Sequence, residues 1–110
     1  MELSKKTTKG WQVIEVNGQV DSKTVGDLRD YLDENIKGDL PVALELSDVP
    51  FMSSAGLRTM LTLYRKTQDM NVKLCLVGLI EEIAETMKVT GFYQYFTNYP
   101  SLSALPEEQK

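Results

Sequence analysis

Two short apolar runs separated by a helical pattern constrain the fold of this chain most strongly. Residues 42–46 read Val-Ala-Leu-Glu-Leu, and residues 72–77 are almost entirely apolar, which is typical of strands buried on both faces. Between them, apolar residues recur at helical spacing over residues 57–64. Because parallel strands need a long crossover connection, this order predicts helices packed on a largely parallel sheet.

The rest of the chain continues the alternation of strand and helix patterns. Residues 11–16 are rich in β-formers and end at Asn17-Gly18, a turn signal. A turn near Lys9-Gly10 would pair them with the preceding segment and make the sheet mixed. We expect strands over residues 3–8, 11–16, 42–46, 72–77 and 95–97, and helices over residues 23–36, from Ser53 or Ser54 onward, from 80 to near 91, and over 101–107. The expected fold class is α/β, a mixed, mostly parallel sheet of about five strands with about four helices packed on it.

Length and composition indicate one globular domain, which we expect to span residues 1–110. The 110 residues are 42% hydrophobic and 25% charged, enough for a single core. The net charge is -4 and no cluster of Lys and Arg is present, so we do not expect a nucleic acid as partner. The core is expected to include Met52, Met60, Met70 and Met87, with Cys75 buried and unreactive.

Three features predict a cytoplasmic protein that does not bind a membrane. No apolar run approaches the roughly 20 residues that cross a bilayer. The first residues lack the apolar stretch of a signal peptide. Cys75 is the single cysteine, which excludes an intramolecular disulfide and favours a reducing compartment.

The chain contains no histidine, and this absence argues against an enzyme. Histidine is the commonest general base and transition-metal ligand, and Ser-His-Asp and Cys-His catalysis both require it. The glycine-rich phosphate loops and the Gly-x-Ser-x-Gly turn are also absent. We therefore expect no catalytic residue, no metal and no cofactor.

The most informative stretch is the predicted junction between a strand and a helix over residues 49–58. Ser53 or Ser54 is expected to cap the helix, and a phosphate on a serine there would be stabilised by the free N–H groups of the helix start. Gly56 would allow a close approach by another backbone, and Arg58 could help to neutralise an anion. The alternative is that both serines are simply helix caps.

Asp21 and Ser22 form a second polar spot, just before the first predicted helix. They have two interpretations: they cap that helix, or they lie beside the Ser53-Ser54 turn, since loops at one end of an open α/β sheet gather into one site. In the second case Asp21 would orient the serine hydroxyl before phosphorylation and repel the phosphate afterwards.

Residues 42–57 resemble the signature of STAS domains, in particular the bacterial anti-sigma factor antagonists. Residues 16–21 resemble the Gly-x-x-Asp element of that family, and residues 89–92 its Thr-Gly element. The resemblance extends from about Leu3 to Leu105, and the length is similar to that of stand-alone members. Two positions depart from the family pattern. Ser53 stands where many members have an aspartate, and Glu45 replaces a commoner aspartate.

The resemblance implies a partner-switching role. Such proteins bind an anti-sigma factor that is also a serine kinase, which frees a sigma factor. The kinase then phosphorylates the motif serine, here Ser54 with Ser53 as the alternative, and a PPM-type serine phosphatase restores binding. The residues expected at the partner surface are Asp21, Ser22, Ser53, Ser54, Ala55, Gly56, Leu57 and Arg58. Two alternatives are a scaffold of the same fold that controls a secretion or phosphatase-linked switch, and a small-molecule sensor or enzyme whose serine turn binds an anion.

Overall fold

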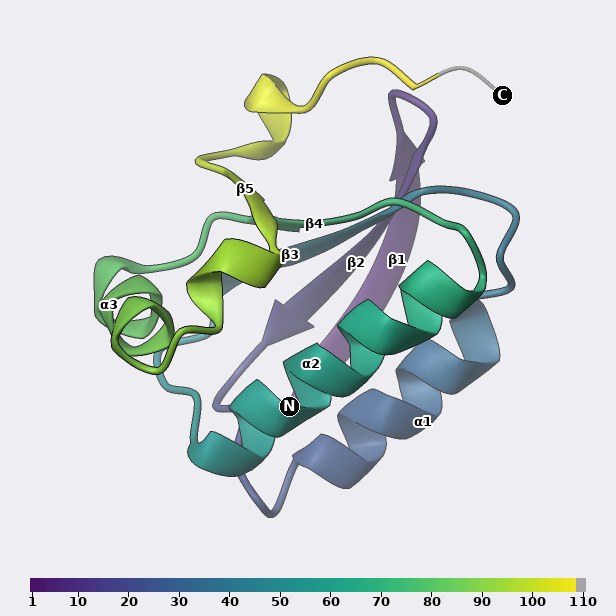
Figure 1. Cartoon of the computed structure of the whole chain (residues 1–110). Helices are drawn as coiled ribbons and strands as arrows, with labels where there is room; N and C mark the ends of the chain where they lie inside the picture. Colours follow the sequence, from purple (N-terminus) through teal and green to yellow (C-terminus); the bar gives the residue numbers. More distant parts are fainter. Residues whose placement is uncertain (109–110) are drawn as a thin grey trace.

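The computed structural model describes residues 1–108 and contains a five-stranded sheet in the order β1-β2-β3-β4-β5 (Figure 1). The first pair is antiparallel and the remaining pairs are parallel, so the expected mixed, mostly parallel sheet is confirmed. The strands are β1 (Glu2–Thr8), β2 (Trp11–Asn17), β3 (Val42–Asp48), β4 (Leu74–Val77) and β5 (Thr97–Tyr99). The helices are α1 (Val25–Asn35), α2 (Ser54–Asp69) and α3 (Glu81–Val89), and two short 3-10 turns follow, η1 (Tyr93–Tyr95) and η2 (Leu102–Ala104).

The period-2 alternation of the central strands separates two apolar clusters, one on each face of the sheet. The larger cluster lies under the helices and contains Ile14 and Leu44 from the strands and Leu28 from α1. The smaller one contains Val13 and Ala43, the neighbours of those strand residues in sequence. Figure 1 shows α1 and α2 side by side over the sheet. Both faces of the central strands are therefore buried, as their apolar composition predicts.

The C-terminal segment covers part of the second face. Leu105 packs in the smaller cluster beside Trp11, and the Trp11 Nε1–H donates a hydrogen bond of 2.8 Å to the Pro106 carbonyl. The Glu108 N–H donates to the Lys9 carbonyl at 2.8 Å. These contacts join the C-terminal segment to the β1–β2 hairpin, at the start of the chain.

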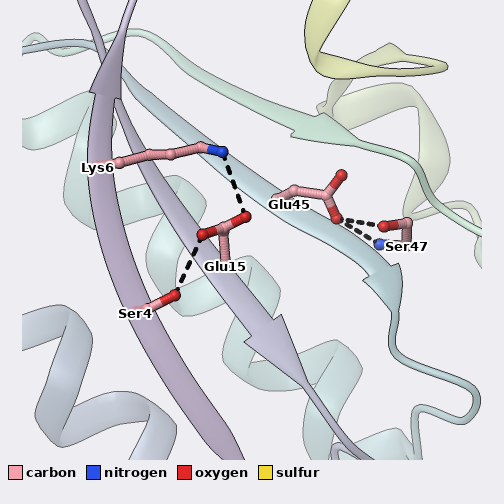
Figure 2. A network of polar contacts seen from close by, with 5 residues as sticks. All are labelled: Ser4, Lys6, Glu15, Glu45 and Ser47. Atoms are coloured by element: carbon pink, nitrogen blue, oxygen red, sulfur yellow. Dashed lines mark hydrogen bonds and ion pairs between the residues drawn. The ribbon is translucent and has the colours of Figure 1, made fainter.

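The remainder of the second face is polar and open to solvent. Figure 2 shows Glu15 on β2 between Ser4 and Lys6 of β1, with its carboxylate 3.2 Å from the Ser4 hydroxyl and 3.5 Å from Lys6 Nζ. On β3, one Glu45 oxygen accepts bonds of 2.7 Å from both the backbone N–H and the hydroxyl of Ser47. Of these residues, Ser4, Glu15, Glu45 and Ser47 line a groove of about 460 Å³. The second face is thus apolar beneath the C-terminal segment and acidic beyond it.

Two expectations about the C-terminal part of the chain, one on the last strand and one on a terminal helix, are wrong. The last strand lies two residues later than expected, at Thr97–Tyr99, because Tyr93–Tyr95 form a 3-10 turn. The helix expected over residues 101–107 is wrong. Apart from the short η2 turn, this segment is not helical. The described chain therefore has three α-helices, not four.

Proline explains why no terminal helix forms. Pro106 disfavours helical backbone at the residue before it, and Leu105 is extended, with φ of -62° and ψ of 134°. Ser101 precedes the turn, but its side chain makes no capping bond. Its hydroxyl instead lies 2.8 Å from the Ser103 hydroxyl.

Three of the four methionines expected in the core are buried. Met52, Met60 and Met87 belong to the core, as expected. Met70 is 36% exposed, because it follows the last residue of α2, where the chain leaves the helix layer. The expectation of a core position for Met70 is therefore wrong.

Cys75 is expected to react slowly with thiol reagents in the folded protein. Its side chain is 1% exposed, and burial, with a smaller contribution from the charge of Glu108, raises the pKa of the thiol from the ordinary 9.0 to about 12. At pH 8, labelling should be on the order of a hundredfold slower than in urea. Because the folded-state pKa is the higher one, the contribution of this group to stability is complete below pH 9 and is lost as pH rises from about 9 to 12. Equal labelling rates with and without urea would contradict the burial of Cys75.

Candidate functional site

Ser53 caps α2, and Ser54 is the first residue of that helix. Ser53 has extended backbone, with φ of -78° and ψ of 176°, and its hydroxyl accepts a hydrogen bond of 3.3 Å from the Gly56 N–H. The prediction that one of the two serines caps the helix is confirmed for Ser53. Ser54 is exposed, and its hydroxyl has no hydrogen-bond partner within residues 1–108. The structure therefore separates the roles of the two adjacent serines, because Ser53 caps the helix and Ser54 does not.

The two polar segments singled out in the sequence are neighbours in space. The Val20 N–H donates to the Phe51 carbonyl at 2.9 Å, and the Ser53 N–H donates to the Val20 carbonyl at 2.8 Å. These bonds make a short parallel bridge between Val20 and Met52. The loop after β2, which carries Asp21 and Ser22, therefore lies against the loop after β3, which carries the serines.

Gly56 is where α2 approaches these paired loops. A Cβ at this position would lie 2.6 Å from Met52 Cγ, 2.9 Å from Val20 Cγ1 and 3.0 Å from the Val20 carbonyl oxygen. The close approach expected at Gly56 is confirmed. Only glycine allows the first turn of α2 to rest directly on both loops.

Asp21 binds the backbone of its own turn. One carboxylate oxygen accepts bonds from the N–H groups of Lys23 at 2.9 Å and Thr24 at 3.2 Å. The Asp21 carbonyl also accepts from the Thr24 and Val25 N–H groups, so Asp21 organises the turn that leads into α1. Within the described chain its carboxylate makes no bond to the Ser54 hydroxyl, and Ser22 beside it is exposed.

The remaining residues predicted at the site divide into buried and exposed ones. Leu57 is buried in the core and Ala55 is half-buried against it. Arg58 is exposed. The first turn of α2 contains no acidic residue, so no carboxylate there offsets the positive end of the helix dipole.

Phe51 is a part of this surface that sequence analysis missed. Its side chain is 50% exposed, two residues before the capping serine. The available signal was a large apolar residue directly after Pro50, in the predicted junction between the strand and the helix, where neither periodic pattern requires it to be buried. An exposed aromatic ring is a common anchor at protein interfaces.

Two general features of the described chain complete this description. Residues 1–108 contain no cluster of three or more His, Cys, Asp or Glu side chains that could hold a metal ion. In the same residues, every helix is too short or too polar to cross a membrane. The fold and the site define an α/β domain with a polar surface at the carboxyl ends of β2 and β3, where the two loops meet.

The family model described as the STAS domain matches residues 2–105, and the chain belongs to this family. A protein from Bordetella bronchiseptica, named BtrV and described as a candidate anti-sigma factor antagonist, is 28% identical over 97 residues, which are 87% of this chain and 84% of that protein.

Solved structures show the same fold at low sequence identity. An anti-sigma factor antagonist from Mycobacterium paratuberculosis has a TM-score of 0.82 and 23% identity, covering 93% of this chain and 87% of that one. The Bacillus cell fate determinant SpoIIAA in its phosphorylated form has a TM-score of 0.66 and 17% identity, covering 88% of this chain and 90% of that one.

Proposed function

We propose that this protein is a cytoplasmic anti-sigma factor antagonist of a partner-switching pathway. In this proposal it binds an anti-sigma factor that is also a serine kinase and so releases a sigma factor. The single observation that carries it is the exposed Ser54 hydroxyl at the start of α2, which makes no hydrogen bond within the described chain and lies on a surface built from two hydrogen-bonded loops. The chain acts by binding and is not itself an enzyme, and residues 1–110 form one domain.

Two independent facts support the proposal. The Bordetella relative is described as a candidate anti-sigma factor antagonist. A solved structure of the same fold is that of a protein in its phosphorylated form. Neither fact concerns a residue of this chain. The choice of Ser54 therefore rests on its position in the motif and on the local structure.

Ser54 is the better substrate of the two serines. The Ser53 hydroxyl is half-buried and accepts the capping bond from Gly56, so its modification would remove that cap. The Ser54 hydroxyl is exposed and makes no hydrogen bond to any residue of the range 1–108. In the reaction, the Ser54 oxygen forms a bond to the γ-phosphorus of ATP, the bond from that phosphorus to the oxygen of ADP breaks, and the hydroxyl proton is released. A PPM-type serine phosphatase reverses the modification by hydrolysis.

Phosphorylation changes the charge of the surface without requiring a change of fold. It adds a charge of about -1.5 to -2 to a surface that includes Asp21, Ser22, Phe51 and Arg58 around Ser54. In a desolvated interface an uncompensated charge of this size costs several kcal/mol. Release of the partner is the expected consequence.

The test is mass spectrometry of the protein from its native cells, beside a Ser54→Ala version. The expected result is a single phosphate on the peptide containing both serines, absent from the variant. Phosphate on Ser53 would keep the switch and move its site. No phosphate under any growth or stress condition would overturn the proposal, and would favour a scaffold of the same fold that controls another target.

Binding to the kinase partner is expected to respond to charge at position 54. Ser54→Ala should bind with an affinity close to that of the wild type and resist phosphorylation, whereas Ser54→Asp should bind at least about tenfold more weakly. Thr86→Asp is the matched control, because it adds the same charge on an exposed position of α3. Isothermal titration calorimetry measures all four affinities. Equal affinity of the wild type and Ser54→Asp would contradict the prediction.

A further inference from the structure

Two arginines on the exposed side of α2 lack a charged partner. Arg58 and Arg65 are exposed, and within residues 1–108 neither guanidinium forms an ion pair or a side-chain hydrogen bond. Lys66 on the same helix differs, since its ammonium lies 2.7 Å from an Asp33 oxygen on α1. The only acidic residue of α2 is Asp69, at its last position. Arg58 therefore has no competing anion in its part of the helix.

The position of Arg58 relative to Ser54 follows from helix geometry. The two residues are four apart, so they lie on the same face of α2, with roughly 5–6 Å between their Cβ atoms. Side chains in a helix lean toward its N-terminus and cover the preceding turn. A side chain at position 58 is therefore expected to cover the turn that begins with Ser54.

We propose that Arg58 binds the phosphate on Ser54 across one turn of α2. This inference rests on the proposed function, because it requires Ser54 to be the modified residue. The guanidinium donates two parallel hydrogen bonds to phosphate oxygens, a geometry that lysine cannot reproduce. Residue 58 acts as a positioning residue for the modified state, and takes no part in phosphoryl transfer.

Arg65 cannot take this role. It is eleven residues from Ser54, which is roughly 16 Å along the helix axis, beyond the reach of a phosphate at position 54. Arg65 is nevertheless exposed, on the same helix, and unpaired in the described chain. It is therefore a matched control for the loss of one positive charge.

Capture of the phosphate would change two surface groups in one event. Before modification, Ser54 offers a small hydroxyl and Arg58 a free cation. After modification, the same turn carries a phosphate paired with that cation, so a partner loses access to both. The pair also holds the phosphate against α2, which explains how the modification would leave the fold of the helix start intact.

The test uses protein with phosphoserine genetically encoded at position 54, so that no kinase is needed. The titration of the phosphate is followed by phosphorus NMR in four proteins: the wild type, Arg58→Gln, Arg58→Lys and Arg65→Gln. A neighbouring cation favours the dianionic form of the phosphate. The midpoint of the phosphate titration should therefore be about half a pH unit lower in the wild type than in Arg58→Gln. Arg58→Lys should lie between them, and Arg65→Gln should match the wild type.

A second measurement needs no variant at position 58. The Arg58 Nε–H resonance of the wild-type sequence should shift between the Ser54 and phosphoserine forms, while that of Arg65 should not. Identical phosphate midpoints in the wild type and Arg58→Gln, or an unmoved Arg58 resonance, would overturn the inference. Because the phosphate is installed directly, these results do not depend on whether cells phosphorylate Ser54, which the mass spectrometry decides separately.

Discussion

Replacing Gly56 with alanine is expected to lower the free energy of unfolding by about 1–3 kcal/mol, the usual cost of overpacking. Alanine is the better helix former by about 1 kcal/mol, so helix propensity alone predicts the opposite sign. The added Cβ would lie 2.9 Å from Val20 Cγ1 and 3.0 Å from the Val20 carbonyl oxygen. That carbonyl accepts the Ser53 N–H bond, so relief of the clash requires the two loops of the site to move apart.

Gly26→Ala provides the matched control for this substitution. Gly26 lies in α1, and a Cβ there would meet no atom within 4 Å. Its replacement should raise the free energy of unfolding by about 0.5–1 kcal/mol. Urea unfolding followed by circular dichroism measures both variants. A Gly56→Ala protein as stable as Gly26→Ala would show that α2 does not rest tightly on the paired loops.

Trp11→Ala is expected to destabilise the protein by about 3–5 kcal/mol, as is typical for removal of a large buried aromatic side chain. Trp11 is 3% exposed, and its ring packs with Val13, Ala43 and Leu105 on the second face of the sheet. The substitution also removes the Nε1–H bond to the Pro106 carbonyl. The C-terminal segment should then detach from the sheet, and Cys75 beneath it should label faster.

Two further variants separate the causes of the stability loss expected for Trp11→Ala. Trp11→Phe keeps most of the apolar contact but removes the bond to Pro106, and should cost about 1–2 kcal/mol. Val89→Ala removes apolar atoms from a position that is 85% exposed, and should change stability by less than about 0.5 kcal/mol. A Trp11→Ala protein within 1 kcal/mol of the wild type would mean that the C-terminal segment contributes little to the second cluster.

Local patterns in the sequence determined the class of fold and the location of the candidate site. The apolar runs at β3 and β4 predict strands buried on both faces, and the helical spacing that follows Ser54 predicts α2. These predictions succeed because period 2 and period 3.6 each place apolar side chains on the faces that become buried. The start of α2 was also predictable, since serine favours the position before a helix.

Other features were decided only by tertiary contacts. Register along β5 depends on pairing with β4, so a local reading placed the strand two residues too early. The segment after Ser101 has polar residues that suit a helix, but burial of Leu105 against Trp11 and the constraint of Pro106 hold it extended across the sheet.

The candidate site, too, depends partly on local sequence patterns and partly on tertiary contacts. In the sequence, the family resemblance favours Ser54 over Ser53, but the local pattern allows either serine to cap the helix, and Asp21 lies more than thirty residues away. The bridge between Val20 and Met52 brings the two loops together, and the capping bond to Gly56 occupies Ser53 and leaves Ser54 free. The sequence by itself determined that a helix begins here on a parallel sheet. Only the tertiary structure decided which hydroxyl faces solvent. Ser53 is used as the cap of α2, and the packing of the first turn of α2 on both loops, which Gly56 allows, sets the orientation of Ser54.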